Sequence, residues 1–164
     1  MAEPTDITFK ICDVRVNVRA VAIIVNNGCI LFQKRETDPV WALPGGKVAI
    51  MEKGCETINR ELEEEIGEQV EVLSLLDVKE NFFEFNGEKF HEYMFMYLTN
   101  LKSDSKLKDN KFFDGVETNK HLKYAWFNSN ELDNAHIVPI EIIDMLKGIV
   151  ENEQEKVVKS KVRR

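Results

Sequence analysis

The chain has 164 residues, of which 43% are hydrophobic and 31% are charged, a composition typical of one folded globular domain. Its net charge of −7 at pH 7 argues against a general nucleic-acid-binding surface, because attraction to a phosphate backbone needs positive patches. No run of about 18 apolar residues occurs, so the sequence predicts no membrane span.

The three cysteines, Cys12, Cys29 and Cys55, are odd in number and widely spaced. This pattern predicts neither a disulfide framework nor a thiolate zinc site, and it fits a reducing cytosol. The first residues contain no apolar core of signal-peptide length. We therefore expect a cytoplasmic protein.

The first predicted elements form a hairpin. Residues 18–25 are rich in β-branched side chains and predict a buried strand. Asn-Asn-Gly at 26–28 predicts a tight turn, so residues 29–34 are expected to return as a second strand. Residues 41–46, Trp-Ala-Leu-Pro-Gly-Gly, then predict a short extended segment that breaks at its two glycines.

An amphipathic helix is predicted over residues 53–66, ending at Gly67 as a left-handed cap. Apolar side chains three, four and four residues apart form its buried stripe: Cys55, Ile58, Leu62 and Ile66. Residues 70–85 then predict a long or broken strand, Asn-Gly at 86–87 a turn, and residues 90–98 a returning strand.

The last part of the chain begins with a polar stretch at 101–119, which we expect to be a loop. Residues 122–127 predict a strand, residues 129–132 a short capped helix, and Pro139 the start of a final helix ending near residue 153. Strands, one acidic helix, more strands and a closing helix indicate a mixed α/β fold built from hairpins, with a sheet between helices.

The central helix carries a concentration of negative charge. At about 100° per residue, Glu61, Glu64 and Glu65 fall in one sector beside the apolar stripe. Like charges at this spacing cost about 0.2–0.5 kcal/mol per pair. Arg60 is placed to reach Glu64 four residues on, and a bound divalent cation such as Mg²⁺ or Mn²⁺ is the other remedy. By itself, such an acidic run is more typical of a solvated face.

The spacing of charges and glycines follows a known pattern. Residues 46–67 read glycine, five residues, Glu, seven residues, Arg-Glu, an aliphatic residue, any residue, Glu-Glu, any residue and glycine. The matching positions are Gly46, Glu52, Arg60, Glu61, Leu62, Glu64, Glu65 and Gly67. On these positions the chain resembles the Nudix hydrolase family (MutT-like). It departs from the usual pattern at Met51, where a glycine is common, and at Glu68, where an aliphatic residue is common.

The resemblance implies an α/β/α sandwich with a mixed sheet, in which the Nudix box is a loop-helix-loop. The resemblance covers a core of about 17–150. Chain length predicts a single domain over residues 1–164, and the basic composition of the end of the chain predicts a tail at 154–164. The resemblance also implies Mg²⁺- or Mn²⁺-dependent hydrolysis of a nucleoside diphosphate linked to another moiety. Nucleoside triphosphates, ADP-ribose-like diphosphates and nucleotide sugars all remain open as the small-molecule substrate, and a homodimer remains open too.

Carried over by position, the resemblance makes Glu61 and Glu65 the principal metal ligands and Glu64 a third or water-mediated ligand. The carbonyl of Gly45 resembles the family's backbone ligand. Two supporting roles follow from the same match: Arg60 orients a box carboxylate, and Glu52, together with Gly46, braces the loop.

Further candidates lie outside the box. Many relatives take another carboxylate from a later loop, and Glu117 is the candidate here, ahead of Glu80 and Glu92. Either Glu61 or Glu117 is expected to take the proton of the attacking water. Arg35 and Arg19 are candidates for phosphate contacts, with surface or packing charges as the alternative.

Aromatic residues of the predicted 70–98 hairpin offer faces for a nucleobase, although such residues are more typical of a core. They are Phe82, Phe83, Phe85 and Phe90. His91 on the same hairpin is expected to be structural.

Two other functions compete with hydrolysis. One is a catalytically silent nucleotide-binding regulator with the same fold, although such proteins usually lose the box carboxylates. The other is an isomerase acting on an isoprenoid diphosphate, which would need an activating cysteine in residues 41–46, where none occurs.

Overall fold

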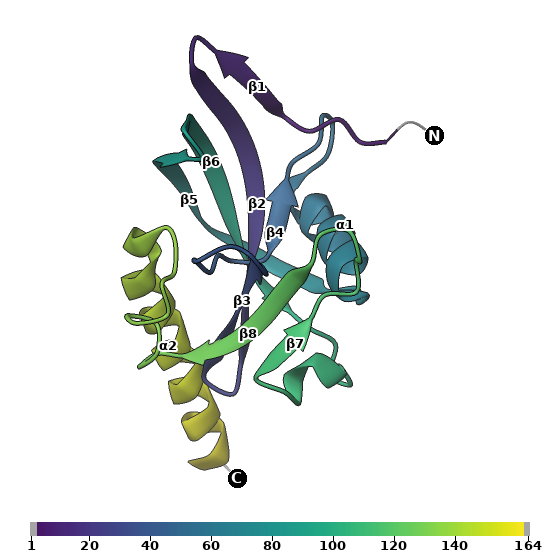
Figure 1. Cartoon of the computed structure of the whole chain (residues 1–164). Coiled ribbons are helices and arrows are strands. Elements are labelled where there is room, and N and C mark those ends of the chain that lie inside the picture. Colours follow the sequence, from purple (N-terminus) through teal and green to yellow (C-terminus); the bar gives the residue numbers. More distant parts are fainter. Residues whose placement is uncertain (1–2, 163–164) are drawn as a thin grey trace. The chain divides into compact units, whose positions relative to one another are not determined.

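A computed structural model describes residues 3–162, and their contacts form two compact units (Figure 1). The first unit comprises the chain up to Ile23 together with Pro44–Ser103, and the second comprises Ile24–Leu43 and the chain from Asp104 onward. The elements, in chain order, are β1 (Thr8–Ile11), β2 (Val14–Asn26), β3 (Cys29–Arg35), β4 (Gly45–Lys47), α1 (Gly54–Ile66), β5 (Glu71–Phe85), β6 (Glu88–Asn100), η1 (Lys106–Lys108), β7 (Phe112–Asp114), β8 (Leu122–Asn128), η2 (Ile140–Ile142) and α2 (Ile143–Val162).

In the first unit, strands follow the order β5-β6-β2, and β1 and β4 also pair with β2. The antiparallel register of β4 sets Gly46 opposite Ala20 of β2. Helix α1 contacts β4 and β5. Apolar side chains of α1, β2 and β6 are buried: Ala20, Val21, Ala22, Ile23, Ile58, Leu62, Ile66, Met94 and Met96. This burial fixes which face of α1 turns inward.

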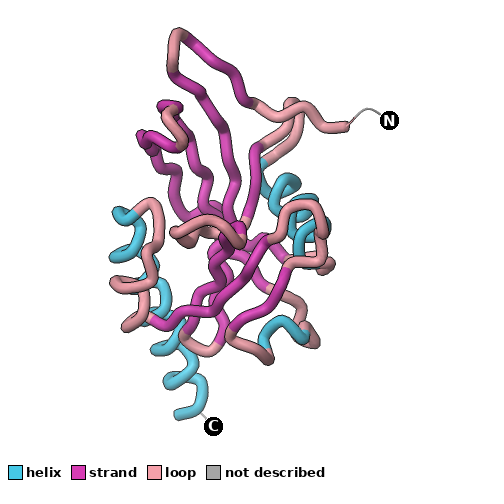
Figure 2. Tube along the Cα trace, in the orientation of Figure 1, coloured by secondary structure: helices cyan, strands magenta, loops and turns pink. Residues whose placement is uncertain are grey.

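In the second unit, β2 ends and the chain turns through Asn27 and Gly28, whose φ angles of 48° and 75° are left-handed. This is the backbone that a tight hairpin requires. Strand β3 then pairs along its whole length with β8, and β8 pairs with β7. Helix α2 contacts β3. Figure 2 shows strands in magenta and helices in cyan within each unit.

The predicted mixed α/β fold is confirmed. The central helix runs over Gly54–Ile66, and Gly67 caps it with a φ of 74°. Both predicted turns form. Strands β2, β3 and β6 extend beyond their predicted limits because backbone pairing continues past the apolar runs, whereas β5 begins one residue later than predicted. None of the helices in the described chain is long and apolar enough to cross a membrane. A single domain over the whole chain stays a prediction.

The predicted loop at 101–119 instead contains η1 and β7. Contacts distant in sequence order this polar stretch: Trp126 Nε1 donates a hydrogen bond to the carbonyl of Leu107 (2.9 Å), and Phe113 stacks on Tyr124. A polar composition alone gives no sign of these partners.

Two predictions near the end of the chain were also wrong. Residues 129–132 form turns rather than a helix, and the Asn128 side chain accepts hydrogen bonds from the main chain of Asn130 and Glu131 within them. Helix α2 continues to Val162 instead of ending near residue 153, so it takes up most of the predicted basic tail. Residues 163–164 of that tail lie outside the described residues.

A glycine in α2 offers a test of the helix. A Cβ added at Gly148 would meet nothing within 4 Å, so Gly148→Ala should raise the free energy of unfolding by about 0.5–1 kcal/mol through helix propensity. Denaturant unfolding measures this change. Gly87→Ala is the matched control: it also meets open space but sits at a φ of 76°, so it should destabilise. Equal effects of both substitutions would contradict the prediction.

Candidate active site

Helix α1 turns two of its carboxylates toward the protein interior. Glu61 and Glu65 lie four residues apart and are only 8% and 3% exposed. Glu63 and Glu64 are exposed to solvent. The three carboxylates predicted to share one sector of the helix therefore differ in burial. Glu61 and Glu65 are buried beside the apolar stripe, and Glu64 is on the solvent-exposed face of α1.

Two glycines allow β4 to pass close to β2 and α1. A Cβ on Gly46 would lie 2.3 Å from Cδ of Glu61 and 2.5 Å from its Oε1. A Cβ on Gly45, whose φ is 150°, would lie 2.1 Å from the carbonyl oxygen of Ala20. Only residues without a side chain fit at these two positions, so the glycines bring the Glu61 carboxyl against the main chain of β4.

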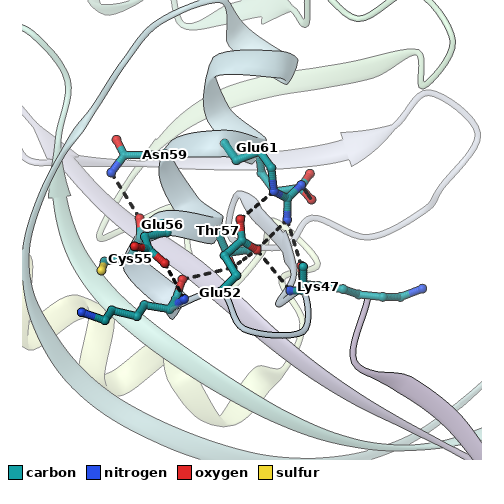
Figure 3. Close-up of polar contacts among 10 residues, drawn as sticks. Lys47, Glu52, Cys55, Glu56, Thr57, Asn59 and Glu61 are labelled. Atoms are coloured by element: carbon teal, nitrogen blue, oxygen red, sulfur yellow. Dashed lines mark hydrogen bonds and ion pairs between the residues drawn. The ribbon is translucent and has the colours of Figure 1, made fainter. Parts of the chain in front are cut away.

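Arg60 connects the helix to the preceding loop through hydrogen bonds to Glu61 and Glu52, the two carboxylates labelled in Figure 3. Its Nη1 donates a hydrogen bond to Oε1 of Glu61 at 2.8 Å. Its Nε and Nη2 donate to the two carboxylate oxygens of Glu52 at 2.8 and 2.9 Å. The predicted pairing of Arg60 with Glu64 is thus replaced by a bidentate contact, which suits the planar guanidinium better than one exposed partner.

Glu52 holds the loop to the helix through further contacts. Its Oε2 accepts hydrogen bonds from the main-chain N–H of Ala49 (3.1 Å) and from Oγ1 of the buried Thr57 (2.7 Å). The hydrogen bonds from Arg60, joined by those from Thr57 and Ala49, lower the pKa of Glu52 to about 2 despite its partial burial. Glu52 therefore stays ionised over the physiological pH range.

The loop between Ala49 and Glu52 has a constrained backbone. Met51 has a φ of 67°, and its side chain is 97% exposed. A left-handed conformation costs a residue with a side chain about 1–2 kcal/mol. Met51 thus adopts the left-handed backbone conformation that a glycine at this position would adopt without that cost.

A second charged cluster lies in the same unit, where β2, β4 and β6 contribute Arg19, Lys47 and Glu92. Arg19 is directly opposite Lys47 in the β2–β4 register. Glu92 is buried, and this burial raises its pKa, while Arg19, a hydrogen bond from Asn81 and Lys47 act in the opposite direction. No local pattern in the sequence connects these residues or distinguishes Lys47, because it is the pairing of β4 with β2 that brings Lys47 beside Arg19.

Arg35 and Glu117 belong to the second unit. Arg35 is exposed at the end of β3. Glu117 forms an ion pair with Lys120 at 3.2 Å and lines a small cavity with His121 and Lys123. Their predicted participation in the active site stays a prediction.

The aromatic residues of the β5–β6 hairpin are on the surface. Phe82, Phe83 and Phe85 are exposed, so the expectation that they belong to a core was wrong for these three, whereas Phe90 is half-buried. The His91 ring lies 4.5 Å from the ring of Phe82 and 5.1 Å from that of Tyr93. His91 thus takes part in an aromatic row.

The donor atoms at the box are oxygens. Within residues 3–162, no group of three or more His, Cys, Asp or Glu side chains is assembled around a point that could hold a metal ion. The chemistry of the donors nevertheless fits Mg²⁺ or Mn²⁺, which prefer carboxylate and carbonyl oxygens. Glu61 and Glu65 supply two buried carboxylates, and the carbonyl of Gly45 lies on the adjacent strand.

The fold and this arrangement define a mixed α/β protein with an acidic loop-helix-loop. A model of the NUDIX domain matches residues 15–146, which span both units. The chain therefore belongs to the NUDIX domain family. Members of this family typically depend on divalent metal ions and are generally pyrophosphohydrolases.

Solved structures agree with this assignment. A MutT NUDIX hydrolase from Burkholderia pseudomallei is 33% identical, with 70% of this chain and 84% of that chain covered and a TM-score of 0.55. The MutT protein from Methanosarcina mazei Go1 (23% identity, 85% and 95% covered, TM-score 0.53) and a UDP-X diphosphatase (21%, 84% and 64%, 0.54) share the fold. No curated protein matches the sequence significantly.

The contacts of Glu52 lead to a prediction about acid stability. Glu52→Gln should lower the free energy of unfolding at neutral pH by about 1–3 kcal/mol, because the charge-assisted bonds to Arg60 are weakened. The pKa of Glu52 falls from 4.5 to about 2 on folding, so its stabilisation is present above pH 4.5 and disappears as the pH falls toward 2. Urea unfolding across this range should show wild type and variant converging.

Glu63→Gln on the exposed face of the same helix is the control for Glu52→Gln. It should leave the free energy of unfolding within about 0.5 kcal/mol of wild type at neutral pH. A constant difference between Glu52→Gln and wild type down to pH 2 would contradict the assigned pKa.

Proposed function

We propose that this protein is a pyrophosphohydrolase that uses Mg²⁺ or Mn²⁺ and water to cleave the diphosphate of a nucleoside diphosphate linked to another moiety. The observation that carries the proposal is the position of Glu61: it is buried, lies against Gly46 and is hydrogen-bonded by Arg60. A carboxylate held in this way has a fixed orientation, which is what ligation of a cation requires.

The residues that would hold the ion are Glu61, Glu65 and the carbonyl of Gly45, with Glu64 as a further or water-mediated ligand. A divalent ion bound there would neutralise diphosphate oxygens and lower the pKa of water. Arg60 orients Glu61, and Glu52 in turn fixes Arg60 with two hydrogen bonds. Because Arg60 already contacts two carboxylates, we assign it to positioning.

The remaining roles concern the proton and the phosphates. Glu61 or Glu117 accepts the proton of the attacking water as a general base. Arg19 and Arg35 bind phosphate oxygens of the substrate. The support for Arg19 is its position beside Lys47, where β2 and β4 pair next to the box glycines. Two cations on neighbouring strands suit a ligand with several negative charges.

A substrate panel tests the function. Nucleoside triphosphates, ADP-ribose and UDP-linked sugars are each incubated with Mg²⁺ or Mn²⁺, and the products are identified by mass; the UDP arm follows from the fold shared with a UDP-X diphosphatase. Solvent ¹⁸O shows which phosphorus is attacked. We expect release of a nucleoside monophosphate from at least one class, abolished by a chelator and restored by the metal. Nucleotide binding without any product would instead support the silent regulator.

The buried carboxylates give a sharper prediction. Glu61→Gln and Glu65→Gln should each lower kcat at least about 100-fold, or about 2.7 kcal/mol, because an amide is a poor ligand for a hard cation. Steady-state kinetics on the best substrate measures this loss, and circular dichroism checks that the variants fold.

The matched control for these two variants is Glu63→Gln, which makes the same chemical change on the exposed face of α1. It should keep kcat within about twofold of wild type, equivalent to less than about 0.5 kcal/mol. Near-wild-type turnover of Glu61→Gln or Glu65→Gln would remove that residue from the site.

A further inference from the structure

Strand β5 is the last strand in the order β5-β6-β2, so its outer edge pairs with no strand in the described part of the chain. None of its side chains is buried. Its ladder with β6 is regular from Asp77 to Phe85, whereas register shifts interrupt it between Val72 and Ser74 and between Leu75 and Asp77. Its exposed apolar side chains are Leu73, Leu75, Leu76, Val78, Phe82, Phe83 and Phe85. A long apolar edge strand of this kind is a template for pairing with another strand.

A hydrogen bond at Val78 shows which main-chain groups of β5 lie along this edge. Its main-chain N–H donates a hydrogen bond to Oδ1 of Asp77 at 2.8 Å, so it points away from β6. Groups of one strand alternate between its two sides in an antiparallel ladder. The main-chain groups at 78, 80 and 82 therefore lie along the outer edge, while those of the residues between them face β6.

We propose that the outer edge of β5 binds the same edge of a second copy of this chain, in an antiparallel pair centred on Val78. In this register each Val78 N–H donates to the Val78 carbonyl of the other copy, and the Asp77 carboxylate that now accepts this N–H is released. The two copies are related by a two-fold axis, which closes the assembly as a dimer.

Charge complementarity selects the second copy and the register. With Val78 at the centre, Asp77 of each copy lies opposite Lys79 of the other, at positions between the hydrogen-bonded pairs, where side chains approach most closely. Centring the pair one residue later places Lys79 opposite Lys79, and two residues later places Glu80 opposite Glu80. The register on Val78 alone among these three forms two opposite-charge pairs.

Apolar side chains add to the contact. Val78, Glu80 and Phe82 pair across the hairpin with Phe95, Tyr93 and His91, so they lie on one face, where the exposed Glu80 separates the two apolar side chains of β5. Joining two edges brings the Val78 side chains together at the centre of the contact. Burial of such surface supplies the non-specific part of the affinity, and the Asp77–Lys79 pairs supply its register.

Charge reversal tests the pairing by sedimentation equilibrium at micromolar concentrations. We expect wild type at twice the chain mass of 19.0 kDa. Asp77→Lys and Lys79→Asp each place like charges opposite one another, so each should dimerise at least about tenfold more weakly. An equimolar mixture of these two variants restores both attractive pairs and should form heterodimers. The double variant Asp77→Lys/Lys79→Asp should form homodimers for the same reason.

Lys102→Asp, an exposed charge reversal outside β5, is the control and should dimerise like wild type. Circular dichroism establishes that each variant folds. A wild type that stays monomeric, as expected if the edge is guarded by its own charges or takes a strand of a different protein, would overturn the proposal. So would single variants that dimerise as tightly as wild type, or a mixture that does not associate. Because no substrate is used, the result is independent of the proposed hydrolysis.

Discussion

The guanidinium of Arg60 joins the loop before α1 to the carboxylates on it. It donates to both oxygens of Glu52 and to one oxygen of Glu61, and Glu52 passes the constraint to the main chain at Ala49 and to Thr57. A buried carboxylate is costly unless its oxygens are hydrogen-bonded. This network therefore permits Glu61 to remain inside the protein at a fixed angle, and a fixed angle is what a ligand of a small cation needs.

Close packing gives the network its position. Gly45 and Gly46 let β4 run within contact distance of β2 on one side and of Glu61 on the other, where any Cβ would collide. The apolar stripe of α1 packs inward beside the same carboxylates. Hydrophobic burial thus decides which two of the helix carboxylates are enclosed and leaves Glu64 in solvent.

The β5–β6 hairpin has two different surfaces because its side chains alternate. On one face, Met94 and Met96 are buried, and Glu92 lies among them as a buried carboxylate near Arg19 and Lys47. On the other face, Phe82, His91 and Tyr93 form an aromatic row that reaches solvent. The same hairpin therefore contributes Glu92 to the charged cluster of the first unit and provides the outer edge of β5, from which we infer self-association.

The sequence by itself determined the family, the central helix with its Gly67 cap, both hairpin turns and the carboxylates that the helix carries, because these depend on local backbone preferences and on a fixed spacing of charges. The tertiary structure decided which side chains contact one another. Arg60 pairs with Glu52 instead of Glu64, and the polar stretch at 101–119 is ordered by contacts with Trp126 and Tyr124. Three phenylalanines of the β5–β6 hairpin are exposed to solvent. Each of these outcomes depends on groups distant in sequence whose proximity no local pattern encodes.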